Sequence, residues 1–452
     1  MTNRDRTVAV GQRVFEDMME SNLNNNGTTT VKAPEKADLC FGVMALSDCA
    51  VMAVAREKGF FEQQGLNVRL SKEVSWANIR DKVVVGELDG AQMLAAMPIA
   101  ASLDIEPFHV PMITAFSLGL NGNAITVSDS LLQQMYEVDA DAMASPIAGA
   151  RALKKVIANL GRKLVFAHVY PYSSHNYELR YWLASAGINP DEDVQLIVIP
   201  PAQMVSHLGE GDIDGYCVGE PWNGQAVQSG IGHTLVTSYD LWNNKPEKVF
   251  AVTQDWHDRY PATHQAVLVA MLQAARWTDH PDNREELAAI LCNRDYVDAP
   301  LEVISASLHG NLESLCRHPA QSLSDFNVFF RYAASFPWVS HAQWFISQMY
   351  RWGQIGEALN IRQVARQIYR PDLYRQAAQR VGIPCPLEDE KVEGCHAENW
   401  MLNDIEMGKD LFFDGSQFDP GKIVEYIARF EVNRLSVDID ALMTATTRPV
   451  AQ

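Results

Sequence analysis

The apolar residues of this chain fall into short continuous runs separated by longer segments with helical spacing. The run LCFGVMAL from Leu39 predicts a buried strand, and the segment after it places Ala50, Ala53 and Val54 on one face of a helix. The elements predicted next are a strand over 66–73, a helix over 76–86 and a strand over 88–94. This alternation of strands and helices is typical of an α/β domain with a parallel sheet.

The same alternation returns later in the chain. It predicts strands over 163–171, 193–200 and 213–219, with helices over 175–187 and 201–211 between them. The phrase Gly-acid-aliphatic-Asp-Gly stands at both 86–90 and 211–215. Helix–Gly–strand junctions recur in any α/β protein, but the matching order and spacing favour two lobes of similar plan.

The repeated phrase has a structural interpretation. Its first glycine is expected to end a helix with a positive φ, and its Asp-Gly to allow a close approach to neighbouring backbone. Ligands of open α/β sheets bind beyond the carboxyl ends of the strands. Two lobes whose strand ends face each other would form a cleft that captures a small molecule by hinge closure.

The predicted fold is therefore α/β, with two lobes, an interlobe ligand cleft and a helical C-terminal region. The expected division is an N-terminal extension and linker at 1–38, lobe 1 at 39–126, lobe 2 at 127–249, a return segment of lobe 1 at 250–370 and a C-terminal extension at 371–452. Within the last third, 326–355 is expected to be helical core and 399–432 an exposed amphipathic tail.

Composition argues against several classes of partner and site. The chain has 452 residues, a formal net charge of −19 and a pI near 5.0, which argues against nucleic acid or an anionic membrane as a direct partner. Its seven cysteines form no CxxC, and Cys385, Cys395 and His396 lack zinc-finger spacing, so no metal, cofactor or disulfide framework is predicted. No apolar run reaches about 18 residues, and the N-terminus lacks the apolar core of a signal peptide. A cytoplasmic location is expected, with a periplasmic or membrane-associated one if the true N-terminus carries a signal.

Five residues at the predicted strand-to-helix junctions are candidates for ligand binding: Trp76, Asn123, His175, Gly219 and Lys248. Each has an ordinary alternative, since the tryptophan could be core, the histidine a helix cap, the asparagine a turn residue and the lysine a solvated charge. Together, an amide, an imidazole, an ammonium, an aromatic face and an approachable backbone suit a small planar oxyanion.

Several long stretches, in order, resemble one family: the nitrate- and bicarbonate-binding proteins of bacterial ABC transporters and their cytoplasmic relatives that sense nitrate and nitrite. They are SDCAVMAVAREKGFFEQQGLNV, SWANIRDKVVVGELDGAQMLAAMP, NGNAITVS, SSHNYELRYWLASAGINP, DGYCVGEPWN and NNKPEKVFAVTQDW, and the resemblance spans about 39–370. It implies that the five candidates hold the anion. Asn123 stands where transport-type members often have Gln. Lys248 stands where bicarbonate binders carry an acidic residue, which favours nitrate or nitrite.

The resemblance implies the two-lobed, periplasmic-binding-protein-like (type II) fold. It also implies a binding protein and not an enzyme. The missing export signal favours a cytoplasmic sensor, which in this family controls an RNA-binding antiterminator. The alternative is the substrate-binding component of a nitrate/nitrite ABC transporter, whose partner would be a permease. A pyrimidine-synthesising enzyme on a related fold is a third possibility, but the chain contains no GxGxxG after a strand, no Walker loop, no HExxH and no GxSxG.

Overall fold

The first sheet builds one lobe around the N-terminal strands. A computed structural model describes residues 32–107, 109–311 and 323–447. Three parallel strands, β1 (Asp38–Val43), β2 (Asn67–Lys72) and β3 (Gly90–Leu94), lie in the order β2-β1-β3. The sheet continues with β11 (Lys248–Thr253), antiparallel to β3, and then β4 (Met112–Ser117). Lobe 1 is thus completed by a strand that follows lobe 2 in the sequence.

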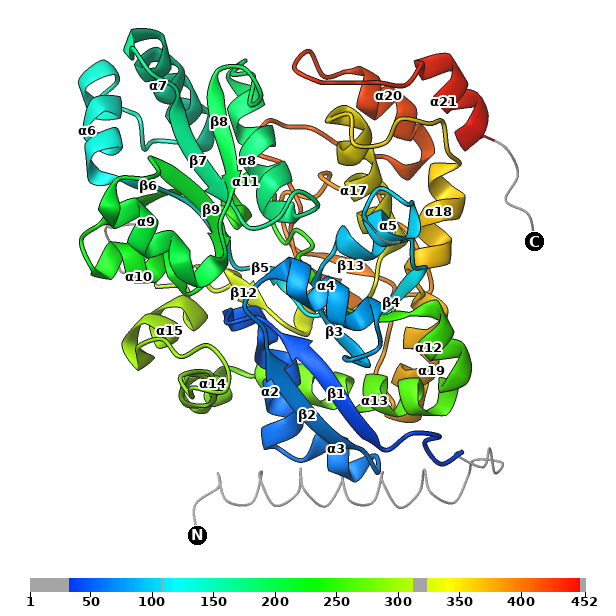
Figure 1. The fold of residues 1–452 in the computed structure, drawn as a ribbon. Helices are drawn as coiled ribbons and strands as arrows, with labels where there is room; N and C mark the ends of the chain where they lie inside the picture. Colours follow the sequence, from blue (N-terminus) through cyan, green and yellow to red (C-terminus); the bar gives the residue numbers. More distant parts are fainter. Residues whose placement is uncertain (1–31, 108, 312–322, 448–452) are drawn as a thin grey trace.

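The second sheet repeats this plan. Its parallel strands are β7 (Leu164–His168), β8 (Val194–Val198) and β9 (Gly215–Gly219), followed by the antiparallel β6 (Asn123–Ser128) and then β10 (Gly232–Thr237). The order β8-β7-β9-β6-β10 matches β2-β1-β3-β11-β4 strand for strand. The prediction of two lobes of similar plan is confirmed (Figure 1). Each lobe contains one antiparallel strand, β11 or β6, that directly follows a crossing of the chain from the other lobe.

The repeated phrase explains how these strands meet. Gly86 and Gly211 have φ values of 77° and 79°, as expected for glycines that end helices. A Cβ at Gly90 would lie 2.8 Å from Val252 Cγ1, and one at Gly215 would lie 2.9 Å from the carbonyl oxygen of Thr126. Both neighbours belong to the inserted antiparallel strands. The phrase therefore occurs twice because each lobe must admit the backbone of such a strand beside its third parallel strand.

Helices cover both sheets. Those of the first lobe and its return segment are α2 (Ala50–Glu57), α3 (Phe60–Gln63), α4 (Trp76–Val84), α5 (Met97–Ser102), α12 (Gln254–Arg259), α13 (Pro261–Thr278), α14 (Arg284–Leu291) and α15 (Leu301–Leu308). Those of the second lobe are α6 (Asp129–Val138), α7 (Pro146–Asn159), α8 (Ser174–Ser185), α9 (Met204–Glu210), α10 (Trp222–Gln228) and α11 (Ser238–Leu241). No helix within the described ranges combines the length and apolarity of a membrane-spanning segment.

Two crossings join the lobes. The first runs between β4 and β6 and contains β5 (Leu120–Asn121), which pairs with β12 (Asn327–Val328). The second runs between β10 and β11. The crossings occupy residues 118–122 and 238–247. Both lie a few residues before the domain boundaries expected at 126/127 and 249/250. Of the extension expected at 1–38, residues 1–31 lie outside the described residues.

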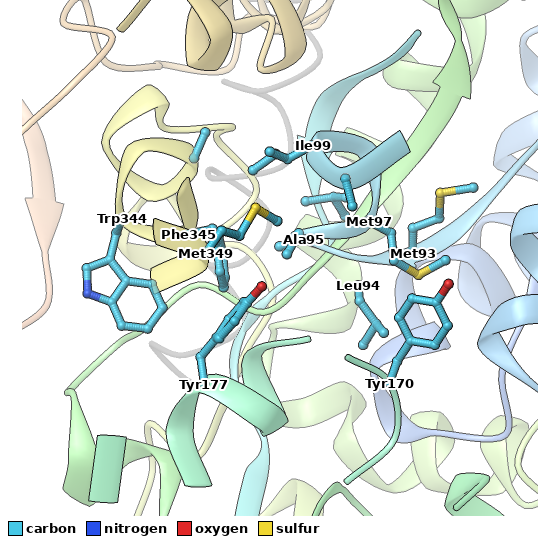
Figure 2. Packing of buried hydrophobic residues seen from close by; sticks show 14 of the residues in the cluster. Met93, Leu94, Ala95, Met97, Ile99, Tyr170, Tyr177, Trp344, Phe345 and Met349 are labelled. Carbon is cyan, nitrogen blue, oxygen red and sulfur yellow. The ribbon is translucent and has the colours of Figure 1, made fainter. Parts of the chain in front are cut away.

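Residues 339–447, here called the C-terminal region, pack against both lobes. Their helices and strands are α17 (Val339–Arg351), α18 (Ile361–Ile368), α19 (Pro371–Arg380), β13 (Trp400–Leu402), β14 (Ile405–Met407), α20 (Ile423–Ala428) and α21 (Ile439–Thr446). Every residue of α17 is buried. Figure 2 shows Phe345 and Met349 of this helix in one apolar cluster with Ala95 and Met97 of lobe 1 and Tyr177 of lobe 2.

Hydrogen bonds reinforce this packing on both sides. The Tyr369 hydroxyl donates to the carbonyl of Ala95 in lobe 1 (2.9 Å), and the Tyr177 hydroxyl of lobe 2 donates to Gln354 Oε1 (2.7 Å). The expectation of core for 326–355 is confirmed, with the helix confined to α17. The expectation of an exposed tail at 399–432 is wrong. Phe418 is fully buried there. The apolar side chains of this segment are covered because α20 packs against α17, and Phe412, Phe413 and Phe430 pack against Tyr181 of α8.

Candidate functional site

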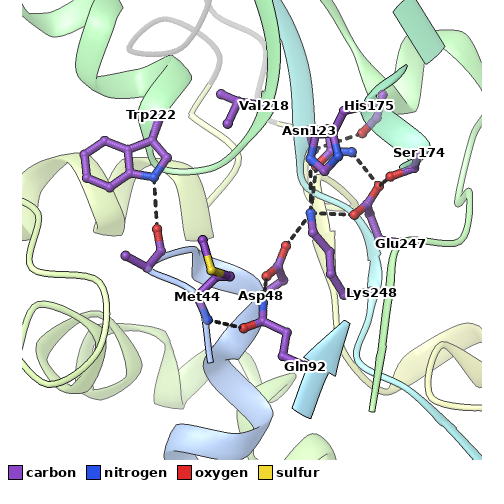
Figure 3. Close-up of polar contacts among 12 residues, drawn as sticks. Met44, Asp48, Gln92, Asn123, Ser174, His175, Val218, Trp222, Glu247 and Lys248 are labelled. Carbon is purple, nitrogen blue, oxygen red and sulfur yellow. Dashed lines mark hydrogen bonds and ion pairs between the residues drawn. The ribbon is translucent and has the colours of Figure 1, made fainter. Parts of the chain in front are cut away.

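A buried polar cluster lies where the two lobes meet, and Lys248 is at its centre. This residue opens β11 and is fully buried. Its Nζ lies 3.1 Å from Asn123 Oδ1 and 3.3 Å from His175 Nε2 (Figure 3). A Cβ placed on Gly219 would be 3.2 Å from the same Nζ and 3.3 Å from Asn123 Oδ1. Four of the five predicted residues are therefore brought together.

The local structure explains why these residues converge. Asn123 and Gly219 are paired residues of β6 and β9, at the end of lobe 2 that faces lobe 1. His175 lies in the first turn of α8, whose N-cap is Ser173, because the Ser173 hydroxyl accepts the N–H of Asn176 (3.0 Å). The histidine is therefore not the cap, and its ring is available to the cluster.

Trp76 approaches the cluster only indirectly. It opens α4 behind the N-cap Ser75 and is 1% exposed. It shares a hydrophobic cluster with Leu46, whose Cδ2 would lie 3.3 Å from a Cβ on Gly219. Within the described part of the chain its indole Nε1 has no hydrogen-bond partner. Trp76 thus contributes a buried donor on the lobe 1 side, without a recorded contact to the other four.

Sequence reasoning missed the acidic members of the cluster. Asp48 Oδ2 lies 2.6 Å from Lys248 Nζ, and Glu247 Oε2 lies 2.5 Å from it. A second ammonium, Lys245 Nζ, bridges Glu178 Oε1 (2.6 Å) and Glu247 Oε1 (2.7 Å). The available signal for Glu247 and Lys245 was the run of alternating charges KPEK at 245–248, which ends at the predicted Lys248.

Burial controls the protonation of this cluster. Desolvation raises the pKa of Asp48 and of Glu178, whereas Lys245 and Lys248 outweigh desolvation and lower the pKa of Glu247. With all carboxyl groups ionised, two ammonium groups face three carboxylates and leave one net negative charge. With Asp48 and Glu178 protonated, the net charge becomes one positive. The cluster therefore becomes more favourable to an anion as protons are taken up.

Asn123 does not have a free donor. Its Nδ2 donates to Glu178 Oε1 (3.0 Å) and to Glu247 Oε1 (2.5 Å), while its Oδ1 accepts from Lys248. Both amide hydrogens are used. In this arrangement Asn123 positions the charged groups of the cluster, and does not offer the amide hydrogen that the sequence analysis expected for an anion.

His175, in contrast to Asn123, has a hydrogen-bond donor that is not used by the described residues. Burial, followed by the nearby Lys248, lowers the pKa of His175 well below its usual value, so the imidazole is neutral. Since the Lys248 ammonium can only donate, Nε2 accepts and the ring hydrogen belongs on Nδ1. Nδ1 is buried and has no partner among the described residues. A buried N–H that lacks an acceptor beside an ammonium group fits an anionic acceptor.

The lobes are closed over the cluster. The Ser47 N–H of lobe 1 donates to the Glu220 carbonyl of lobe 2 (2.8 Å), and Trp222 Nε1 of lobe 2 donates to the Ala45 carbonyl (2.9 Å; Figure 3 shows the tryptophan). On another side, Arg80 Nη1 donates to the Tyr170 hydroxyl across the same interface (2.7 Å). Lys248 is thus fully buried at an interface that these contacts hold closed.

Comparisons with known proteins agree with this architecture. The model of the NMT1-like family matches residues 32–292. The nitrate/nitrite binding protein NrtA of Nostoc sp. (strain PCC 7120) is 32% identical over 439 residues, which covers 96% of this chain and 94% of that protein. The nitrate import ATP-binding protein NrtC of Synechocystis sp. PCC 6803 is 37% identical over 406 residues, 88% of this chain but 56% of that protein. The chain thus spans little more than half the length of this second relative.

A solved structure extends the match to three dimensions. The crystal structure of the periplasmic nitrate-binding protein NrtA from Synechocystis PCC 6803 superposes with a TM-score of 0.78 at 30% identity, covering 89% of this chain and all of that one. The family match, the full-length relative and this structure agree. The chain belongs to the NMT1-like family, among the substrate-binding proteins of nitrate and bicarbonate ABC transporters.

Proposed function

We propose that this protein binds nitrate or nitrite between its two lobes. The observation that carries the proposal is a pair of buried donors, His175 Nδ1 and Trp76 Nε1, that find no acceptor among the described residues, together with the ammonium group of Lys248. Nitrate and nitrite have only acceptor atoms and carry one negative charge. They would give these donors the acceptors that buried N–H groups require.

The proposed roles differ between the five residues. Lys248 supplies the charge, His175 and Trp76 supply directional hydrogen bonds, and Gly219 leaves room at the cluster because it lacks a Cβ. Asn123 holds Lys248 in place. The names of the relatives, which include nitrate and nitrite binding, support the same ligand class. The family is one of solute-binding proteins, which replaces the alternative of a pyrimidine-synthesising enzyme.

Nitrate and nitrite are expected to stabilise the folded protein. A ligand that binds only the native state at about 100 times its dissociation constant adds about 2.7 kcal/mol to the free energy of unfolding. Thermal unfolding with sodium nitrate, nitrite, bicarbonate and chloride at equal ionic strength checks this, with calorimetric titration for affinity. A rise in melting temperature with bicarbonate but not with nitrate or nitrite would overturn the assignment.

The biological role is a separate proposal. The relatives are transport proteins and favour the substrate-binding component of an ABC transporter, with a permease as partner. One feature favours the cytoplasmic sensor instead: all six cysteines in the described ranges are free thiols, which suits a reducing compartment. In the sensor, an anion that favours the closed lobes would release a regulator, such as an RNA-binding antiterminator, that prefers the open ones.

For the sensor, we expect a protein partner to be retained without nitrate and released with it. A coupling free energy of about 1–3 kcal/mol corresponds to a change in partner affinity of roughly fivefold to 150-fold. The measurement is a pull-down from native cytosol with and without nitrate, using chloride as the salt control. Recovery of the protein only from periplasm or membrane, or partner binding indifferent to nitrate and nitrite, would support the transport role.

A further inference from the structure

A second group of chemically active side chains lies in the C-terminal region. Cys395 and His396 precede the hairpin formed by β13 and β14, and Asp410 follows it. Pairing of the two strands brings Asp410 back beside Cys395 and His396, from which it is 15 and 14 residues away in sequence. We propose that Cys395, His396 and Asp410 form a binding site for a thiophilic d¹⁰ metal ion of the zinc type, separate from the anion site.

The distances fit such an ion. Cys395 Sγ lies 3.2 Å from His396 Nδ1, which lies 3.3 Å from Asp410 Oδ2, and the three ligand atoms are all within 4.8 Å of one another. Tetrahedral zinc with ordinary bond lengths separates sulfur from nitrogen by about 3.6 Å and nitrogen from oxygen by about 3.4 Å. The sulfur–nitrogen and nitrogen–oxygen distances are thus within a few tenths of an ångström of those values, and a fourth position would be open.

The surroundings already orient the ligands. Asp410 Oδ1 accepts the backbone N–H groups of Cys395 (3.0 Å) and His396 (2.8 Å), so this carboxylate, whose side chain is 4% exposed, is fixed beside both residues. The His396 ring stacks on Trp400 at 3.8 Å with an interplanar angle of 8°. Interactions of this kind hold metal ligands in place and strengthen binding.

The nearby positive charge is compensated. Lys391 Nζ lies 3.6 Å from Asp410 Oδ2, but it also forms an ion pair with Glu393, which is 1% exposed. The ammonium group and this carboxylate cancel, and the carboxylate of Asp410 remains to balance part of the charge of a divalent ion. The zinc-finger search in the sequence missed the group because its third ligand follows a hairpin and not a fixed spacer.

A second group of possible ligands provides a control. His207, Glu210 and Asp212 also lie close together, but two of the three are exposed and none is a thiol. Hard oxygen ligands on a solvated helix end are common without a bound ion. The two groups differ in the one property that spectroscopy reads directly, which is the presence of a thiolate ligand.

The test uses the full chain, treated with a chelator and titrated with Co²⁺ as a spectroscopic substitute for zinc. We expect one equivalent of Co²⁺ to produce a thiolate-to-cobalt charge-transfer band and the visible bands of a tetrahedral ion, both removed by added Zn²⁺. Cys395→Ser should abolish the charge-transfer band, and His396→Ala should weaken Zn²⁺ binding by at least about tenfold.

Matched variants make the result specific. Cys385→Ser, which changes another partly buried thiol of this region, and His207→Ala should leave the band and the affinity unchanged. Melting temperatures of all variants without metal identify any that are misfolded. The proposal is overturned if Co²⁺ gives no charge-transfer band, if the band survives in Cys395→Ser, or if it is lost in Cys385→Ser.

Discussion

Removing the ammonium group of Lys248 is expected to weaken nitrate binding by roughly tenfold to a hundredfold, because a charge-assisted hydrogen bond contributes about 1.5–3 kcal/mol. Lys248→Met alone would leave Asp48 and Glu247 without their shared partner, and an unpaired buried charge can cost about 3–5 kcal/mol of stability. The sharper comparison is therefore Asp48→Asn/Lys248→Met against Asp48→Asn. Within the cluster the double variant has the same net charge as the parent.

Calorimetric titration with nitrate measures the effect, and the unfolding transition of each variant shows that it is folded. Lys248→Glu should bind worse still, since it places like charges together. A surface lysine such as Lys155, which pairs with Asp139 in lobe 2, gives a control: Lys155→Met should bind nitrate like the parent. Equal affinities of the double variant and of Asp48→Asn would show that Lys248 is not the charge partner of the anion.

Asp48→Asn alone is expected to tighten nitrate binding at neutral pH by roughly a hundredfold. The Asp48 carboxylate occupies one side of the Lys248 ammonium, and two unit charges about 5 Å apart repel by about 3 kcal/mol at an effective dielectric constant of about 20. Burial raises the pKa of Asp48, so acidification protonates it and removes this repulsion. Parent affinity should therefore rise as pH falls through that pKa, and the asparagine variant should respond less.

Proton linkage gives an independent measurement of the same effect. Because a bound anion raises the pKa of a neighbouring carboxyl group further, nitrate binding by the parent should take up protons. Titrations in two buffers with different ionisation enthalpies count them. Asp48→Asn should reduce the uptake and leave the part due to Glu178. Nitrate binding that is independent of pH in the parent, or weaker in Asp48→Asn, would exclude competition between Asp48 and the anion.

The sequence predicted the parallel strands of both lobes because each forms a short apolar or alternating run, and glycines that end helices precede β2, β3, β8 and β9. It did not predict β6, since the NGNAIT segment was interpreted as a ligand loop, nor that β11 would complete the sheet of lobe 1. Such antiparallel strands are determined by long-range pairing, which local pattern does not report. The glycines at 90 and 215 marked the close approach without identifying the strand that approaches.

Similar limits apply to the site. Strand ends and the family resemblance identified Asn123, His175, Gly219 and Lys248, which the fold brings together. Asp48 was missed because it lies at the start of a helix more than 70 residues before the nearest of these partners. The direction of the Asn123 amide also depends on carboxylates that only the fold places there. Periodicity predicts which helix or strand carries a side chain, but not which charged groups that side chain will contact in the fold.

The contacts of the C-terminal region with both lobes have a consequence for kinetics. Two lobes joined only by a hinge can separate without breaking other contacts. Here the hydrogen bond of Tyr369 joins lobe 1 to the C-terminal region, and that of Tyr177 joins lobe 2 to the same region. Separating the lobes must loosen at least one of these contacts and part of the apolar cluster around α17. Open molecules are then rare, so the observed association rate should level off at high nitrate concentration, at the rate of opening. Ligand release is limited in the same way, and the protein would respond to a lasting change in anion concentration more than to a brief one.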